Sequence, residues 1–179
     1  MSEKPLITRI LDVVYRGFQF LAWTLMGLLI VPVTLQILSR YTGLIPRYIW
    51  TEEAARFCFI WIIMVGATIA VRDGTHFEVD VLPTPKTPKL EAIMRLWVYV
   101  AMLIFTGIFV LYGYQYAMFG WIQTSELTGI NMIFIHGVYF VVGVTWTLFL
   151  GERVWWAIRV LRGDHAALGY LRGDYNVAR

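Results

Sequence analysis

Two groups of charged residues have the types and the spacing to do chemistry. In the first, Glu52, Glu53 and Arg56 stand at the start of the apolar stretch 57–71. If Thr51 caps a helix there, both carboxylates oppose the positive end of the helix dipole, and Glu52 can pair with Arg56 four residues later. The alternative interpretation is a polar surface that a partner protein recognises. The segment before this stretch, which is predicted to be a loop, would add two basic residues to that surface, Arg40 and Arg47.

The second group follows the same apolar stretch and contains five charged or titratable residues: Arg72, Asp73, His76, Glu78 and Asp80. An imidazole with nearby carboxylates is a potential metal site. A helix end with a turn at Gly74 explains the group without a metal, and Arg72 is placed to contact lipids of the inner leaflet. We therefore predict no metal site here.

The elements that must position these residues are membrane helices. Of the 179 residues, 59% are hydrophobic and only 15% are charged, whereas soluble domains carry about 25% charged residues. The charge-free runs 17–39, 57–71, 96–125 and 127–151 contain 23, 15, 30 and 25 residues. Three of them exceed the roughly 20 residues that a membrane helix needs. The second run reaches this length if residues 50–56 continue its helix.

The basic residues predict how these spans are oriented. Of the 15 Lys and Arg residues, twelve fall in the N-terminal segment, the loop between spans two and three, and the C-terminal tail. By the positive-inside rule, both termini are therefore cytoplasmic. The net charge of +3 is a signal of topology, and no nucleic-acid partner is predicted.

The expected fold is an all-α membrane protein with four transmembrane helices, N-in and C-in. Its membrane domain covers residues 1–162, with spans at about 17–39, 51–71, 96–120 and 131–156, and residues 163–179 form a cytoplasmic tail. Pro83, Pro85 and Pro88 interrupt the loop before span three, and Leu90–Leu96 then has apolar residues at helical spacing. A short amphipathic helix on the inner membrane surface is expected there.

Small residues in the last two spans predict how these spans bend and pack. Gly113 and Gly120 are positions where the long third span could bend or stop. Gly143, Thr147 and Gly151 form a face of small residues on span four, which predicts close packing against a neighbouring helix.

The sequence lacks the residues that catalysis or cofactor binding would need. Haem ligation would require paired histidines inside the spans, and only His136 falls within one. An intramembrane protease would require a nucleophile and a base buried together, whereas Ser39 and Ser125 lie at span ends. Cys58 has no second cysteine with which to form a disulfide or metal site. We predict a protein that is not an enzyme, with no catalytic, cofactor-binding or metal-binding residues.

Residues 50–80 closely resemble the signature of the small membrane subunit of tripartite ATP-independent periplasmic (TRAP) transporters, the DctQ family. That signature has a tryptophan, a Glu-Glu pair and an arginine before the span, and a tryptophan and Gly-Ala within it. A glycine, a histidine and Val-Asp follow the span. The matching positions are Trp50, Glu52, Glu53, Arg56, Trp61, Gly66, Ala67, Gly74, His76, Val79 and Asp80.

The resemblance implies a non-catalytic subunit of a sodium-coupled organic-acid importer in a bacterial inner membrane. A large membrane subunit would hold the substrate and sodium sites and move in elevator fashion, and a soluble periplasmic protein would capture the substrate. The small subunit would brace the large one and offer an outer surface to the binding protein. Trp50 would anchor its second span at the outer interface. Charged residues would fix the two ends of that span: Glu52, Glu53 and Arg56 outside, His76 and Asp80 inside.

Two other functions stay open at this point. An autonomous small homo-oligomeric channel or exporter would need a polar stripe through the bilayer, which the charge-free runs do not supply. A membrane anchor of a redox complex is the second alternative. Solute flux through the purified chain in vesicles would favour the channel, and a pigment-free preparation would count against the anchor.

Overall fold

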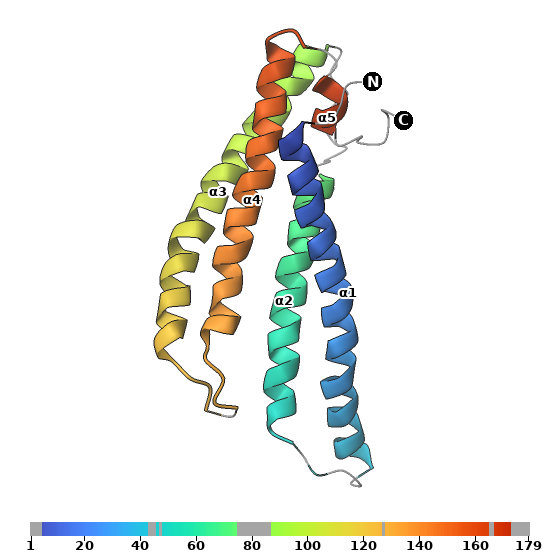
Figure 1. The fold of residues 1–179 in the computed structure, drawn as a ribbon, viewed down its shortest axis with the longest axis vertical. Helices are drawn as coiled ribbons and strands as arrows, with labels where there is room; N and C mark the ends of the chain where they lie inside the picture. The colour runs from blue at the N-terminus through green and yellow to red at the C-terminus, as the bar shows by residue number, and fades with distance from the viewer. Residues whose placement is uncertain are drawn as a thin grey trace.

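The computed structural model describes residues 5–42, 46, 48–74, 87–126, 128–164 and 167–172. These residues form four long helices and one short helix (Figure 1). In chain order, they are α1 (Leu6–Tyr41), α2 (Trp50–Asp73), α3 (Pro88–Ile122), α4 (Ile133–Leu161) and α5 (Leu168–Arg172). The expected all-α class is confirmed.

The four long helices, α1 to α4, are each long and apolar enough to cross a membrane. The most apolar window of each has a mean hydropathy between 1.9 and 2.1. At about 1.5 Å per residue, the 36 residues of α1 and the 35 of α3 exceed a hydrocarbon core of roughly 30 Å. These two helices therefore project beyond the core or cross it obliquely. The N-in and C-in orientation stays a prediction.

The long helices are arranged as two antiparallel hairpins. α1 packs on α2, α3 packs on α4, and the main contact between the hairpins is made by α2 and α4. Figure 1 shows the hairpins close together at the end where α1 begins and α4 ends, and diverging toward the opposite end. An isolated bridge between Thr124 and Asn131 closes the connection from α3 to α4 at that opposite end.

The start of α3 differs from the expectation for Leu90–Leu96. These residues form the first turns of α3, so the predicted separate amphipathic helix is not formed. Pro88 occupies the first turn, where its missing N–H costs no hydrogen bond. The Thr87 hydroxyl caps the helix by accepting from the Leu90 amide at 3.4 Å. α3 also continues through Gly113 and Gly120, at which a bend or stop was expected.

The main core lies where the two hairpins meet and includes residues of α5. Its buried members come from all five helices and include Leu11, Val71, Tyr99, Phe149 and Leu171. The sequence predicted a cytoplasmic tail from residue 163 onward. In the structure, Ala167 and Leu171 of that segment are buried against the helices, and the Tyr170 ring stacks on Trp156 with 4.5 Å between ring centroids. α5 therefore covers this end of the bundle.

Candidate functional sites at the two ends of the bundle

Buried charges join three helices at the end where α5 lies. Arg72, near the end of α2, donates to Asp12 Oδ1 on α1 at 2.8 Å and also pairs with Glu152 on α4. The Thr8 hydroxyl of α1 donates to the other oxygen of Glu152 at 2.6 Å. Arg72 and Glu152 are 3% and 5% exposed. The pairing therefore links α1, α2 and α4 at one point.

Arg153 extends this network to α5. Its guanidinium donates to the backbone carbonyl of Arg72 at 2.7 Å, and to the carbonyls of Tyr170 and Leu171 at 3.1 and 2.9 Å. The first bond satisfies a carbonyl at the C-terminal end of α2 that has no partner within the helix. We call Thr8, Asp12, Arg72, Glu152 and Arg153 the Arg72 cluster.

The Arg72 cluster is built for stability rather than for reaction. Its two basic and two acidic groups are formally balanced, and the ring of Phe149 lies 5.0 Å from the Arg72 guanidinium carbon. Buried charges are tolerated when they are paired and hydrogen-bonded, and removing one partner leaves a costly unpaired charge. The Thr8 hydroxyl donates to Glu152, but that carboxylate is already paired with Arg72, so it is not available as a base. Among the described residues, no group of three or more His, Cys, Asp or Glu side chains could hold a metal ion.

Sequence reasoning placed Arg72 against inner-leaflet lipid and missed its partners. The structure buries its side chain, so Arg72 is not available for that contact. The signal was present in part: Asp12, Arg72 and Glu152 flank three different apolar runs on the same predicted side of the membrane. Which of these helices are neighbours could not be read from the chain. His76 and Asp80, expected to organise the turn after α2, lie outside the described residues.

The other end of the bundle carries several of the predicted site residues. Arg40 and Glu52 help to line one polar cavity of about 280 Å³, together with Gln36, Ser39, Tyr48 and Thr51. The structure thus brings Arg40 and Glu52 together, as the expected outer polar cluster requires. Trp50 and Arg56 are exposed at this end. Arg47 lies outside the described residues.

The first turn of α2 differs in detail from the expectation. α2 begins at Trp50, with Ile49 in the capping position, so Thr51 is not the cap. The Thr51 hydroxyl instead donates to the Tyr48 carbonyl at 2.7 Å. Between the two described side chains of Glu52 and Arg56, no ion pair is formed. Glu52 is therefore free to face the cavity beside Arg40.

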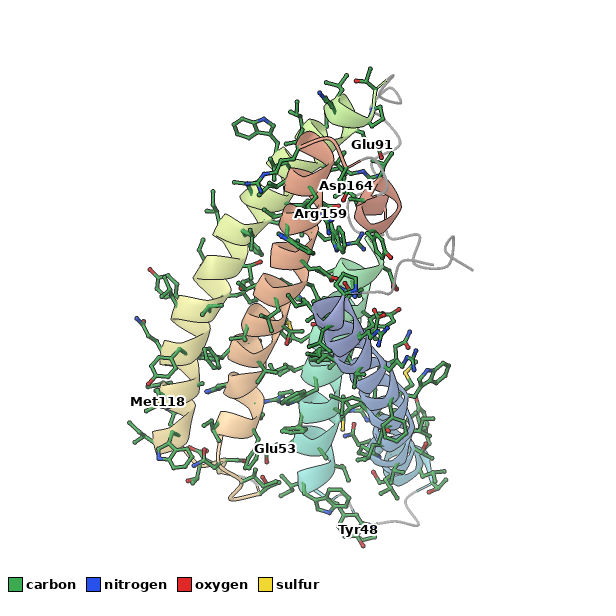
Figure 2. All side chains as sticks on the ribbon, turned by 45° about the horizontal axis from the view of Figure 1, so that its top comes forward. Tyr48, Glu53, Glu91, Met118, Arg159 and Asp164 are labelled. Atoms are coloured by element: carbon green, nitrogen blue, oxygen red, sulfur yellow. The ribbon has the colours of Figure 1, made fainter. Side chains whose placement is uncertain are left out.

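Glu53 points away from this cavity. Its carboxylate lies beside Ser125 and Thr128 of the α3–α4 connection. Figure 2 places it near the lower end of α2, on the side of that connection. Glu53 therefore contacts the α3–α4 hairpin, whereas Glu52 faces the cavity that α1 also lines.

Trp61 and Gly66 occupy different environments within α2. The Trp61 indole donates to the Phe134 carbonyl in the first turn of α4 at 2.7 Å, and so links the two hairpins. Gly66 is exposed, and a Cβ at this position would meet nothing within 4 Å. Trp61 has an intramolecular role, whereas the face at Gly66 is open to lipid or to a partner.

Replacing Trp61 by phenylalanine is expected to destabilise the protein by about 0.5–1.5 kcal/mol, because the Phe134 carbonyl loses its interhelical donor. The measurement is thermal unfolding of the purified protein in detergent. The matched control is Trp97→Phe, because the Trp97 side chain is 74% exposed. Equal shifts for the two variants would show that the hydrogen bond contributes nothing.

The fold and the two sites describe a membrane subunit whose buried charges hold its own helices together. Residues 29–160 match the family described as "Tripartite ATP-independent periplasmic transporters, DctQ component". The chain belongs to this family. It is thus the small permease component of a TRAP transporter and not an enzyme, as the sequence predicted.

Two relatives illustrate the similarity. The sialic acid TRAP transporter small permease protein SiaQ of Vibrio cholerae is 30% identical over 93 residues, which are 52% of this chain and 53% of that protein. The isethionate TRAP transporter permease protein DctMQ of Oleidesulfovibrio alaskensis is 36% identical over 55 residues, 28% of this chain and 9% of that protein. The aligned part of this chain spans about half the length of the first relative.

Proposed function

We propose that this chain scaffolds the large, elevator-type subunit of a TRAP transporter and helps to dock the periplasmic substrate-binding protein. The transporter would take up an organic acid with sodium, which the large subunit binds. The observation that carries the proposal is that the four buried charged residues of the described helices, Arg72, Glu91, Glu152 and Arg153, have partners within the chain. Arg72, Glu152 and Arg153 satisfy one another or nearby backbone, and Glu91 pairs with Arg95 at 3.2 Å. None of these groups is left to bind a solute.

The relatives support the class of substrate. Sialic acid and isethionate, which appear in the names of the two relatives, are both organic acids. In the proposed arrangement, the protein spans a bacterial inner membrane several times with both termini in the cytoplasm. The cavity at Arg40 and Glu52 then faces the periplasm. Exposed apolar faces of α1 and α3 contact lipid or the large subunit.

Reconstitution in vesicles tests this proposal. The chain alone is expected to give no uptake, while the chain with its large subunit and binding protein gives uptake that depends on a sodium gradient. Flux through vesicles that contain the chain alone would contradict the proposal and favour an autonomous channel. Undiminished uptake by the large subunit and binding protein without this chain would also contradict it.

Reversing the charge of Glu52 is expected to lower uptake roughly tenfold, the lower end of the range for electrostatic steering of association. Glu52→Lys changes the exposed end of the bundle without entering the core. The affinity of the soluble binding protein for substrate is expected to stay unchanged, because only its docking is affected. The measurement is uptake as a function of binding-protein concentration.

The matched control for this experiment is Lys89→Glu, which reverses an exposed charge at the opposite end of the bundle. Lys89→Glu is expected to leave uptake at the wild-type level. Wild-type uptake by Glu52→Lys would show that the outer polar cluster is not part of the surface that docks the binding protein.

A further inference from the structure

An apolar groove lies between the two hairpins at the end where they diverge. Its volume is about 300 Å³, and it is lined by α1, α2, the α3–α4 connection and the first turn of α4. The walls include Leu25 and Leu28 from α1, Phe57 from α2, and Ile130 and Phe134 from the second hairpin. Figure 1 shows that α1–α2 and α3–α4 separate toward this end.

Glu53 is the charged residue among the described residues that line this groove. Its carboxylate is hydrogen-bonded to Ser125 and Thr128 of the α3–α4 connection. Its Oε2 atom is buried and has no hydrogen-bond partner among the described residues. An unsatisfied oxygen of a carboxylate in an apolar site is costly, so this position favours an incoming donor.

We propose that the groove receives an apolar segment of the large permease subunit that carries a lysine or arginine, whose cationic group pairs with Glu53 Oε2. This inference rests on the proposed function, because it names the contact through which the small subunit holds the large one. The apolar walls match an apolar segment, and the free carboxylate oxygen matches a cationic donor. A lipid acyl chain would fill the walls but would leave Glu53 unsatisfied.

Other residues near the groove do not supply this donor. Arg56 is exposed on α2 and acts on Glu53 only through a Coulombic interaction. The Asn131 side-chain amide donates to the Trp121 carbonyl at 2.9 Å. Trp61 donates to the Phe134 carbonyl. No donor in the described part of this chain therefore reaches Oε2.

The test is photocrosslinking in membranes that contain the chain together with its large subunit. A benzophenone amino acid replaces Leu28, which lines the groove and is 55% exposed. In a second protein it replaces Ile104 on α3, which is 68% exposed and does not line the groove. The probe at Leu28 is expected to form an adduct with the large subunit.

The same two probes are then combined with changes at the acidic pair. Glu53→Gln keeps the size of the side chain and removes its charge, and is expected to reduce the Leu28 adduct about tenfold or more. Glu52→Gln, the neighbouring control, is expected to leave the adduct unchanged. Any adduct at Ile104 is expected to be the same in all three backgrounds, which shows that the subunit is still folded and inserted.

The possible results separate this inference from the proposed function. If the subunits co-purify but the Leu28 probe reacts only with lipid, or forms no adduct, the groove is not the contact and the inference is overturned. If the adduct forms equally with Glu53→Gln, the charge pairing is overturned. If the wild-type chain does not co-purify with the large subunit at all, the scaffold function fails along with the inference.

Discussion

Replacing Arg72 by methionine is expected to lower the free energy of unfolding by about 3–5 kcal/mol, the range for removing one partner of a buried ion pair. Methionine preserves much of the apolar volume but leaves Glu152 buried without its cation. Asp12 loses the same partner. The loss is measured as the shift in thermal unfolding of the detergent-purified protein, followed by circular dichroism.

The matched control is Arg159→Met, which removes an arginine from a pair that is exposed on both sides. Arg159 and Asp164 pair at 2.8 Å, with side chains 42% and 35% exposed, so a loss of about 1 kcal/mol or less is expected. In the double variant Arg72→Met/Glu152→Gln, the second change removes the unpaired charge. Its destabilisation is therefore expected to be smaller than the sum of the two single effects. Simple additivity, or a shift for Arg72→Met no larger than the control, would contradict the role of the Arg72 cluster.

The second large effect is expected at Gly113, where the backbone of α4 lies close to α3. A Cβ at Gly113 would lie 2.9 Å from the Phe140 backbone nitrogen, and one at Gly143 would lie 3.0 Å from the Val110 backbone nitrogen. These neighbours are backbone atoms, which cannot turn aside as a flexible side chain can. Gly113→Ala is therefore expected to cost about 1–3 kcal/mol through overpacking.

Gly107→Ala on the same helix is the control for Gly113→Ala. A Cβ at Gly107 would meet nothing within 4 Å, so alanine is expected to be neutral or to stabilise α3 by up to about 1 kcal/mol through its higher helix propensity. Thermal unfolding in detergent distinguishes the two variants by the sign of the shift. A stabilising effect of Gly113→Ala would mean that the helices can separate at no cost.

The sequence predicted the four long helices because each contains a long run without charge. It also predicted close packing at Gly143, where the α3 backbone approaches. The same reasoning was less successful at Gly151, around which a Cβ would meet nothing within 4 Å. Spacing along one helix identifies a face of small residues, but it does not tell where along that face the neighbour crosses.

The helix ends and the buried charges could not be predicted in the same way. Arg72 was expected just outside the second span, and Asp12 and Glu152 were given no role. In the structure they lie within helices, because each is neutralised by a partner far away in the sequence. Hydropathy is averaged over residues that are neighbours in sequence, so it cannot identify an ion-pair partner on another helix. The unsatisfied oxygen of Glu53 likewise depends on how two hairpins meet, which no local pattern records.

The Arg72 cluster has a consequence for the order of events during synthesis. Arg72 and Glu152 are 80 residues apart, so at 5–20 residues per second the ribosome needs about 4–16 s to make the second after the first. During that interval Arg72 has only its first acidic partner, Asp12, and lacks Glu152. The guanidinium lies at the helix end, where water or lipid headgroups can solvate it during this wait. When α4 is inserted, Glu152 pairs with Arg72. The last long helix to be translated therefore joins the two hairpins.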